Sequence, residues 1–273
     1  MTSWTIAKQE FKLALRSRWL ILMAVLFTLL SVILLFFGGQ PVVDGFDGFT
    51  RQTASLLNLS LFLMPLLTLL VGGMLIAGEK EDGQLVLYMT YPITERAIIF
   101  GKYIGIGLSL LTVLFIGYGT STIILLFFGT VQWSITILFF LISALLILLF
   151  LSIALSIGFF VSGRLQALGM GLLFWAFFVL LYEFIVMALS MVISAKSVLL
   201  LLTISVFLNP VELIRVFTIL FLGSGTVFGP SIYDFTIWAS SWVGATMFGV
   251  TALVWILCPL GIAHWILRGG RRI

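Results

Sequence analysis

The chain has 273 residues, of which 62% are hydrophobic and only 9% are charged, and its mean hydropathy is +1.28. A soluble domain carries roughly 25% charged residues, so this composition excludes a water-soluble globular protein and indicates an integral membrane protein. The net charge of +4 and the pI near 9.4 are explained by basic residues gathered at one membrane surface, and no nucleic-acid partner is expected.

Residues 1–18 predict an amphipathic helix that lies in the cytoplasmic membrane interface. Its apolar side chains fall within one sector of the helix, and Lys8, Lys12 and Arg16 form a stripe beside them at i, i+4 spacing. Basic side chains in such a position reach the phosphates of membrane lipid. A plain cytosolic extension of the first span is the alternative interpretation.

Six apolar segments are long enough to cross about 30 Å of hydrocarbon as helices. We therefore expect an all-α membrane protein with six transmembrane helices in a single domain, residues 1–273. The first apolar segment is too long for a signal-peptide core and is expected to be retained as a span. An irregular outer loop is expected at residues 38–58. The predicted spans are residues 19–37, 60–77, 100–128, 133–162, 165–194 and 241–267.

The basic residues predict the orientation of these spans. With both termini inside, eleven of the fourteen Lys and Arg residues lie on the inner side, and only Arg51, Lys196 and Arg215 lie outside. Cytoplasmic loops of membrane proteins carry such an excess of Lys and Arg. Both termini are therefore expected to be cytoplasmic.

A charged segment, residues 79–96, separates the second and third spans. Its charged residues are Glu79, Lys80, Glu81, Asp82, Glu95 and Arg96. In so apolar a chain, a cluster of this kind belongs in water. We expect a cytoplasmic loop with a short helix that a soluble partner can push.

Residues 198–222 are apolar but are interrupted by Asn209 and Pro210. Each half is about half a span long, which suits an outer re-entrant hairpin of two short helices. Asn209 suits the N-cap of the second helix and Pro210 its first position, while Glu212 and Arg215 are neighbours at i, i+3. A kinked ordinary span is the alternative.

Glu183 is the one ionisable residue deep in a predicted span, where a carboxylate is costly unless it is paired, protonated or hydrated. Met187 and Met191 follow it on the same helical face. One hypothesis is a substrate path with soft sulfur ligands for a copper or sulfur species. The other is a protonated Glu183 that hydrogen-bonds across a helix interface, with the methionines filling gaps.

Several chemistries lack the residues that they need. The chain contains no Gly-x-x-x-x-Gly-Lys-Ser/Thr loop for ATP. His264 and Cys258 are its only histidine and cysteine, too few for a zinc or copper site of three or four ligands and too few for a disulfide. No catalytic constellation is evident, so the chain is not expected to be an enzyme.

The charged segment resembles the hallmark of the ABC-2 family of ABC transporter permeases. In that family Glu, a basic residue, Glu, any residue, Gly, Thr and Leu precede a short helix, a Pro and a Gly-Lys pair. The matching residues here are Glu79-Lys80-Glu81-Asp82-Gly83-Gln84-Leu85, then Pro92, then Gly101-Lys102, with Gln84 in place of Thr. Within the family, the chain length and the segment from Leu208 to Arg215 resemble the permease of the Nos system, which matures nitrous-oxide reductase and is associated with copper processing.

The resemblance implies a permease homodimer in the bacterial plasma membrane, resting on a separate, dimeric ABC ATPase that uses ATP, while this chain binds no cofactor. The outer hairpin would close the extracytoplasmic side or engage a periplasmic or surface accessory protein. The residues implied in coupling to the ATPase are Glu79, Glu81, Gly83, Leu85, Tyr88, Pro92 and Lys102. Those implied in the outer gate are Asn209, Pro210, Glu212 and Arg215.

The leading functional hypothesis is therefore ATP-driven export or force transmission, with copper or sulfur delivery to nitrous-oxide reductase as its specific form. An ABC-2 exporter of a drug, peptide or lipid is one alternative. An ion-coupled secondary transporter that uses Glu183 is another, and it would work without an ATPase. A membrane scaffold that transports nothing is the third.

Overall fold

The structure, a computed structural model, describes residues 3–37, 51–128, 133–223 and 233–270, and this part of the chain contains helices and no strand. Backbone groups within a membrane must be hydrogen-bonded internally, and a helix achieves this within one segment. The helices are α1 (Ser3–Leu15), α2 (Arg18–Phe37), α3 (Arg51–Glu81), α4 (Gln84–Thr90), α5 (Glu95–Phe128), α6 (Trp133–Phe160), α7 (Arg164–Ala176), the π-helix η1 (Phe177–Leu181), α8 (Tyr182–Val192), α9 (Ala195–Leu208), α10 (Pro210–Phe221), α11 (Tyr233–Ala239) and α12 (Trp242–Gly270). The predicted all-α class is confirmed.

Five helical segments of the described chain are long and apolar enough to cross a membrane. They correspond to the second to sixth predicted spans, and α7, η1 and α8 together form one of them. Two bent pairs bring the number to as many as seven, namely α1 with α2 at 67° and α9 with α10 at 106°. The first predicted span corresponds to α2, which belongs to the first of these pairs.

Two local expectations need correction. The outer loop was predicted at residues 38–58, but α3 already begins at Arg51, and residues 38–50 lie outside the described part. The short helix α11 was not predicted, because its seven residues are too few to display a helical period.

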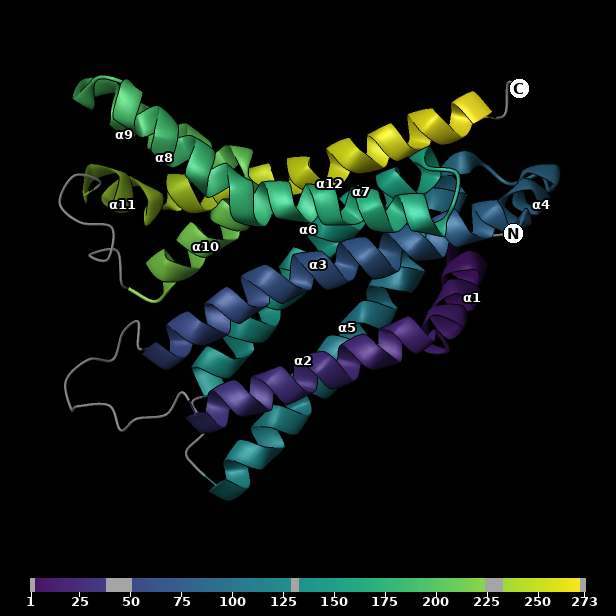
Figure 1. Cartoon of the computed structure of the whole chain (residues 1–273), viewed down its shortest axis with the longest axis horizontal. Coiled ribbons are helices and arrows are strands. Elements are labelled where there is room, and N and C mark those ends of the chain that lie inside the picture. Colours follow the sequence, from purple (N-terminus) through teal and green to yellow (C-terminus); the bar gives the residue numbers. More distant parts are fainter. Residues whose placement is uncertain (1–2, 38–50, 129–132, 224–232, 271–273) are drawn as a thin grey trace.

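The ends of the helices fall into two groups, as Figure 1 shows. The start of α1, the short helix α4 and the carboxyl end of α12 lie at one end of the molecule. The segments α8, α9 and α11 extend toward the opposite end. We call these the α4 end and the hairpin end.

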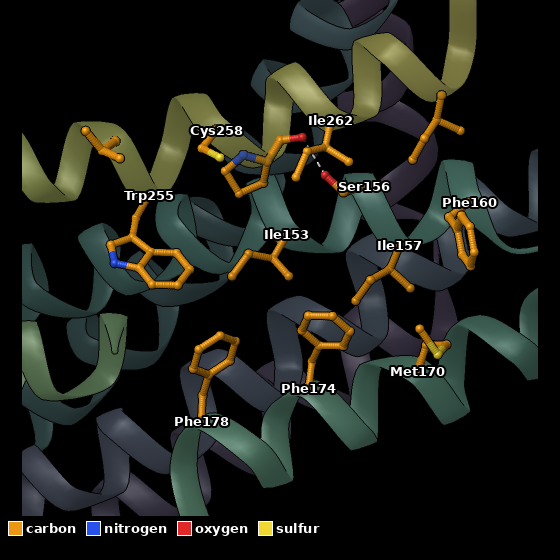
Figure 2. Close-up of a pocket in the computed structure, with 13 residues that line it drawn as sticks. Ile153, Ser156, Ile157, Phe160, Met170, Phe174, Phe178, Trp255, Cys258 and Ile262 are labelled. Carbon is orange, nitrogen blue, oxygen red and sulfur yellow. Dashed lines mark hydrogen bonds between the residues drawn. The ribbon is translucent and has the colours of Figure 1, made fainter. Parts of the chain in front are cut away.

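Pro259 interrupts the hydrogen bonds of α12, because it has no N–H to donate to the carbonyl of Trp255. Ser152 of α6 donates its hydroxyl to that carbonyl at 3.1 Å. Ser156, one turn further along α6, donates to the carbonyl of Pro259 at 2.5 Å (Figure 2). The two serines compensate for the proline and hold α12 against α6.

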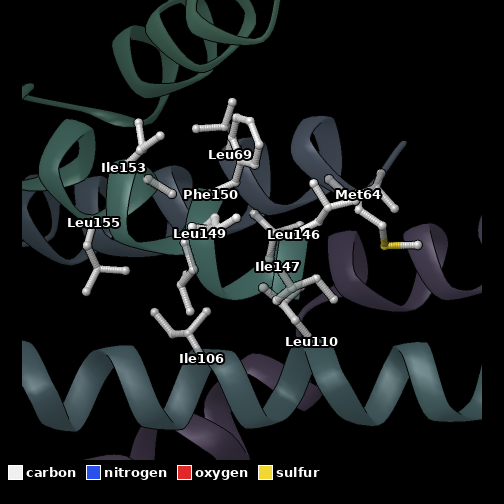
Figure 3. Close-up of a cluster of buried hydrophobic side chains, with 14 of the residues drawn as sticks. Met64, Leu69, Ile106, Leu110, Leu146, Ile147, Leu149, Phe150, Ile153 and Leu155 are labelled. Carbon is white, nitrogen blue, oxygen red and sulfur yellow. The ribbon is translucent and has the colours of Figure 1, made fainter. Parts of the chain in front are cut away.

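The helix α6 lies at the centre of the packing and contacts α3, α5 and α12. Figure 3 shows a cluster of buried side chains where these helices meet, including Met64, Leu69, Ile106, Leu110, Leu146 and Phe150. Burial reaches 78% of the apolar window in α3 and 67% in α6, but only 11% in the α7–α8 segment and 28% in α12. The chain therefore leaves α7–α8 and α12 largely uncovered.

Two glycines allow α1 to lie directly against α5. A Cβ atom at Gly101 would stand 2.8 Å from the Ser3 carbonyl oxygen, and one at Gly105 would stand 2.5 Å from the Ala7 carbonyl oxygen. These approaches are too close for any larger residue. The Gly-x-x-x-Gly spacing therefore serves the packing of α1 within the chain.

We predict that Gly105→Val displaces α1 and lowers the free energy of unfolding by about 1–3 kcal/mol, the cost of overpacking a tight contact. The measurement is unfolding of the purified protein in detergent, together with the rate of proteolysis within α1. Gly119→Val is the matched control, because a Cβ atom at Gly119 of the same helix meets nothing within 4 Å. Equal loss of stability in both variants would contradict the proposed packing role.

Candidate functional site

A sharp turn at Gly83 separates α4 from the end of α3. Gly83 has a φ of +74°, a conformation that glycine adopts without strain, and α4 begins at the next residue. The Asp82 N–H donates to the Gly78 carbonyl at 2.8 Å, and the Gly83 N–H to the Lys80 carbonyl at 3.2 Å. The glycine of the predicted motif therefore lets the chain leave α3 and enter α4 at once.

The charges beside this turn are bound within the chain. Lys80 Nζ donates to the carbonyls of Phe159 and Phe160 at the carboxyl end of α6, at 3.0 and 3.4 Å. Glu81 Oε2 accepts the Arg164 backbone N–H at 2.9 Å. Asp82 pairs with the Arg164 guanidinium at 2.5 Å. The turn is thus attached to α6 and to the first residue of α7.

Lys102 is the centre of a buried ionic cluster. Its side chain has no exposed surface, and its Nζ donates to Glu10 Oε1 of α1 at 2.5 Å and also to Glu79 Oε2 of α3. The same Nζ lies 5.0 Å from the centre of the Tyr88 ring of α4, within the range of a cation–π contact. One ammonium group therefore connects α1, α3, α4 and α5.

The two faces of α4 differ. Leu85 is buried and Tyr88 is half-buried, and burial raises the pKa of the Tyr88 phenol, so this group stays neutral. Val86 and Leu87 are each 62% exposed, and Tyr91 at the end of the helix is 60% exposed. One face of α4 therefore packs against its own chain. The other face presents an apolar patch formed by Val86, Leu87 and Tyr91.

The structure separates the residues predicted for coupling into two groups. Glu79, Leu85 and Lys102 face the protein interior, whereas Glu81 and Pro92 lie at the surface. The sequence motif correctly located α4. The exposed patch of α4, however, consists of Val86, Leu87 and Tyr91. These residues are neighbours of the predicted coupling residues but are not part of the motif.

A second ionic cluster lies toward the hairpin end. Arg215 Nη1 of α10 pairs with Glu212 Oε1 at 3.0 Å, the expected i, i+3 contact, and also with Glu183 Oε1 of α8. Glu183 is therefore paired across a helix interface. The geometry connects the predicted substrate path to the predicted outer gate.

Asn209 forms the predicted N-cap of α10. Its Oδ1 accepts the Val211 N–H at 2.9 Å, and Pro210 occupies the first turn. Its Nδ2 also donates to the carbonyl of Phe178 at 2.8 Å, within the π-helix η1. Buried Asn209 therefore connects the start of α10 to the π-helix of the fifth predicted span.

A cavity of about 400 Å³ adjoins this second cluster. Glu183, Glu212, Arg215 and Met187 line it, but Met191 does not, and its side chain is 73% exposed. Among the described residues, no group of three or more His, Cys, Asp or Glu side chains is gathered for metal binding. The cavity is thus a chamber in which the ionic cluster and one thioether lie in a wall that is otherwise mainly apolar.

These helices and the presented patch on α4 define a multi-pass membrane protein with a short helix exposed for contact. The sequence profile described as "ABC-2 family transporter protein" matches residues 4–268. The chain belongs to the ABC-2 family, which makes it an ABC transporter permease and implies an ABC ATPase partner.

Two curated relatives agree with this assignment. The chain is 33% identical over 274 residues to the "Probable ABC transporter permease protein NosY" of Pseudomonas aeruginosa. It is 32% identical over 272 residues to the protein of the same name from Stutzerimonas stutzeri. Each alignment covers 97% of both chains. The resemblance to the Nos-type permease is thereby confirmed.

Sequence reasoning missed two residues of the site, Glu10 and Arg164. A signal for each exists in the sequence. Glu10 is the only acidic residue among residues 1–18, and Arg164 is the only charged residue between Lys102 and Glu183. An isolated charge in an apolar chain needs a partner. Glu10 pairs with Lys102, and Arg164 binds Glu81 and Asp82.

We predict that Lys102→Met lowers the free energy of unfolding by about 3–5 kcal/mol, because it leaves the Glu10 and Glu79 carboxylates buried without a cation. Unfolding of the purified protein in detergent measures the loss. Adding Glu10→Gln and Glu79→Gln to Lys102→Met should recover most of it. Lys8→Met, at an exposed position of α1, should change stability by no more than about 0.5 kcal/mol. A full loss that persists in the triple variant would show that the charges do not carry the effect.

Proposed function

We propose that this chain is the membrane-spanning subunit of an ATP-driven transporter and that α4 is the helix on which the ATPase docks. The observation that carries the proposal is the patch of Val86, Leu87 and Tyr91, at least 60% exposed at each residue. Such apolar side chains on a short helix outside the spans suit the centre of a protein interface. The charged residues of the turn before α4, Lys80, Glu81 and Asp82, are already bonded within the chain and so make this turn rigid.

Force from the ATPase would reach the membrane through the contacts beneath α4. Tyr88 rests on the Lys102 cluster, and the turn before α4 is bound to Arg164 at the start of α7. Displacement of α4 would thus move α1, α5 and α7 together. Interfaces and packed cores respond to such displacements by switching between discrete arrangements.

For the membrane layout we propose six spans, with both termini in the cytoplasm and the α4 end facing the ATPase. The pair α9–α10 would enter from the outer face and return, as the 106° bend at Asn209 and the excess of basic residues on the inner side support. Two such permeases would pair in the bacterial plasma membrane.

At the hairpin end, we propose that the chamber beside Glu183 and Arg215 belongs to the substrate path and that α10 is its gate. The names of the relatives, together with the resemblance to the Nos system, support delivery of copper or sulfur to nitrous-oxide reductase. Met187 offers a soft ligand and Glu183 a charge for such a species.

The docking proposal predicts that Leu87→Asp weakens binding of the ATPase about ten- to a hundredfold, because a buried leucine contributes about 1.5–3 kcal/mol. The measurement is co-purification followed by titration with the ATPase. Thr94→Asp is the matched control, since it adds the same charge nearby and aspartate also caps a helix. Undiminished binding by Leu87→Asp would refute α4 as the docking helix.

The substrate-path proposal predicts that Glu183→Gln abolishes transport while the protein still assembles with its ATPase. Activity is measured as nitrous-oxide reductase activity in a Stutzerimonas stutzeri strain that lacks its own similar permease and produces this chain. The amount of protein and its co-purification with the ATPase must equal those of the unchanged chain. Near-normal reductase activity in the variant would remove Glu183 from the path.

A further inference from the structure

An apolar groove of about 480 Å³ lies between α6, α7, η1 and α12 (Figure 2). Its volume is within the range of roughly 300–1,000 Å³ that is typical of ligand sites. Ile157, Phe174, Phe178, Trp255 and Ile262 project into it. Neither the outer chamber nor the patch on α4 shares a residue with this groove.

The polar groups in the groove wall are already satisfied. Ser156 donates its hydroxyl to the carbonyls of Pro259 and Ser152, and Trp255 Nε1 donates to the carbonyl of Phe207 at 3.1 Å. A polar ligand would find few partners there and would lose its own hydration. The wall therefore favours a hydrocarbon occupant.

The groove continues into a second hollow at the α4 end. Phe160 and Ile266 line both hollows, and Trp265, Arg268 and Gly269 complete the second one. Arg268 forms no hydrogen bond or ion pair with any residue in the described part of the chain. Trp265 is 76% exposed, and tryptophan favours the boundary between hydrocarbon and headgroups. A cation and an interfacial ring thus stand at the mouth of an apolar groove.

The length of the groove matches one leaflet. From Val254 to Ile266 the groove follows α12 for twelve residues, or about 18 Å, and half of a hydrocarbon core measures about 15 Å. Two of the helices that border it, α7 and α12, belong to the least covered spans, so the groove is accessible from the membrane in this chain.

We propose that one acyl chain of an anionic phospholipid occupies this groove and that its headgroup phosphate pairs with Arg268. The lipid comes from the leaflet at the α4 end. It fills the space between α7 and α12, which pack on α3 and α6 respectively, and so acts as a structural ligand rather than as cargo. This site is independent of the docking of the ATPase on α4.

The test measures lipids that stay bound to the full chain, by native mass spectrometry in detergent micelles doped with equal amounts of phosphatidylglycerol and phosphatidylcholine. The unchanged chain should retain one phosphatidylglycerol in preference to phosphatidylcholine. Arg268→Gln should reduce this preference about fivefold, the effect of one basic residue near an anionic headgroup. Arg18→Gln, an exposed arginine at the start of α2, should leave the preference unchanged.

A second pair of variants tests the acyl chain. Ile262→Trp fills the groove and should abolish retention of the lipid, whereas Leu257→Trp, at an exposed position of α12 outside the groove, should not. Equal effects of Arg268→Gln and Arg18→Gln, or full retention by Ile262→Trp, would overturn the proposal. So would crosslinking of two chains through Cys258, the only cysteine, without retained lipid, since the groove would then be an interface between two copies.

Discussion

The arrangement of the α4 end depends on one buried ammonium group. Removing an ion from water costs several kcal/mol, and the cost is recovered only with good geometry and satisfied partners. Lys102 meets this condition through Glu10 and Glu79, which lie in two other helices. These helices cannot move independently without leaving a buried charge unpaired. This electrostatic constraint therefore holds together α1, α3 and α5, the helices beneath α4.

The ionic cluster at the hairpin end has the same composition as the Lys102 cluster, namely one cation between two carboxylates. Arg215 there joins α8 to α10, as Lys102 joins α1 to α3 and α5. The two clusters differ in their exposure, because the Lys102 side chain is fully buried, whereas 46% of the Glu183 side chain is exposed. The rest of the chain therefore covers the cluster at the hairpin end less completely than the Lys102 cluster.

Composition and local signals predicted much of this structure. Few charges and long apolar runs indicated membrane helices, and the Asn209-Pro210 pair indicated where α10 begins, because caps depend on neighbours in sequence. The partners of the charges were not predictable in this way. Glu10 and Lys102 are 92 residues apart, and only the close packing that Gly101 and Gly105 permit brings them together. The inward and outward faces of α4 likewise depend on which helix lies beneath it.

The α7–α8 segment is bonded to both ends of the molecule, and α7 also packs along α3. At its start, Arg164 binds Glu81 and Asp82 beside α4, and within η1 the Phe178 carbonyl binds Asn209 at the break of the hairpin. Only 11% of its apolar window is buried. A displacement of α4 would therefore reach the hairpin along α7–α8, together with the face of α3 on which α7 packs. The two ends of the chain are thus joined by a continuous helical segment as well as by the core around α6.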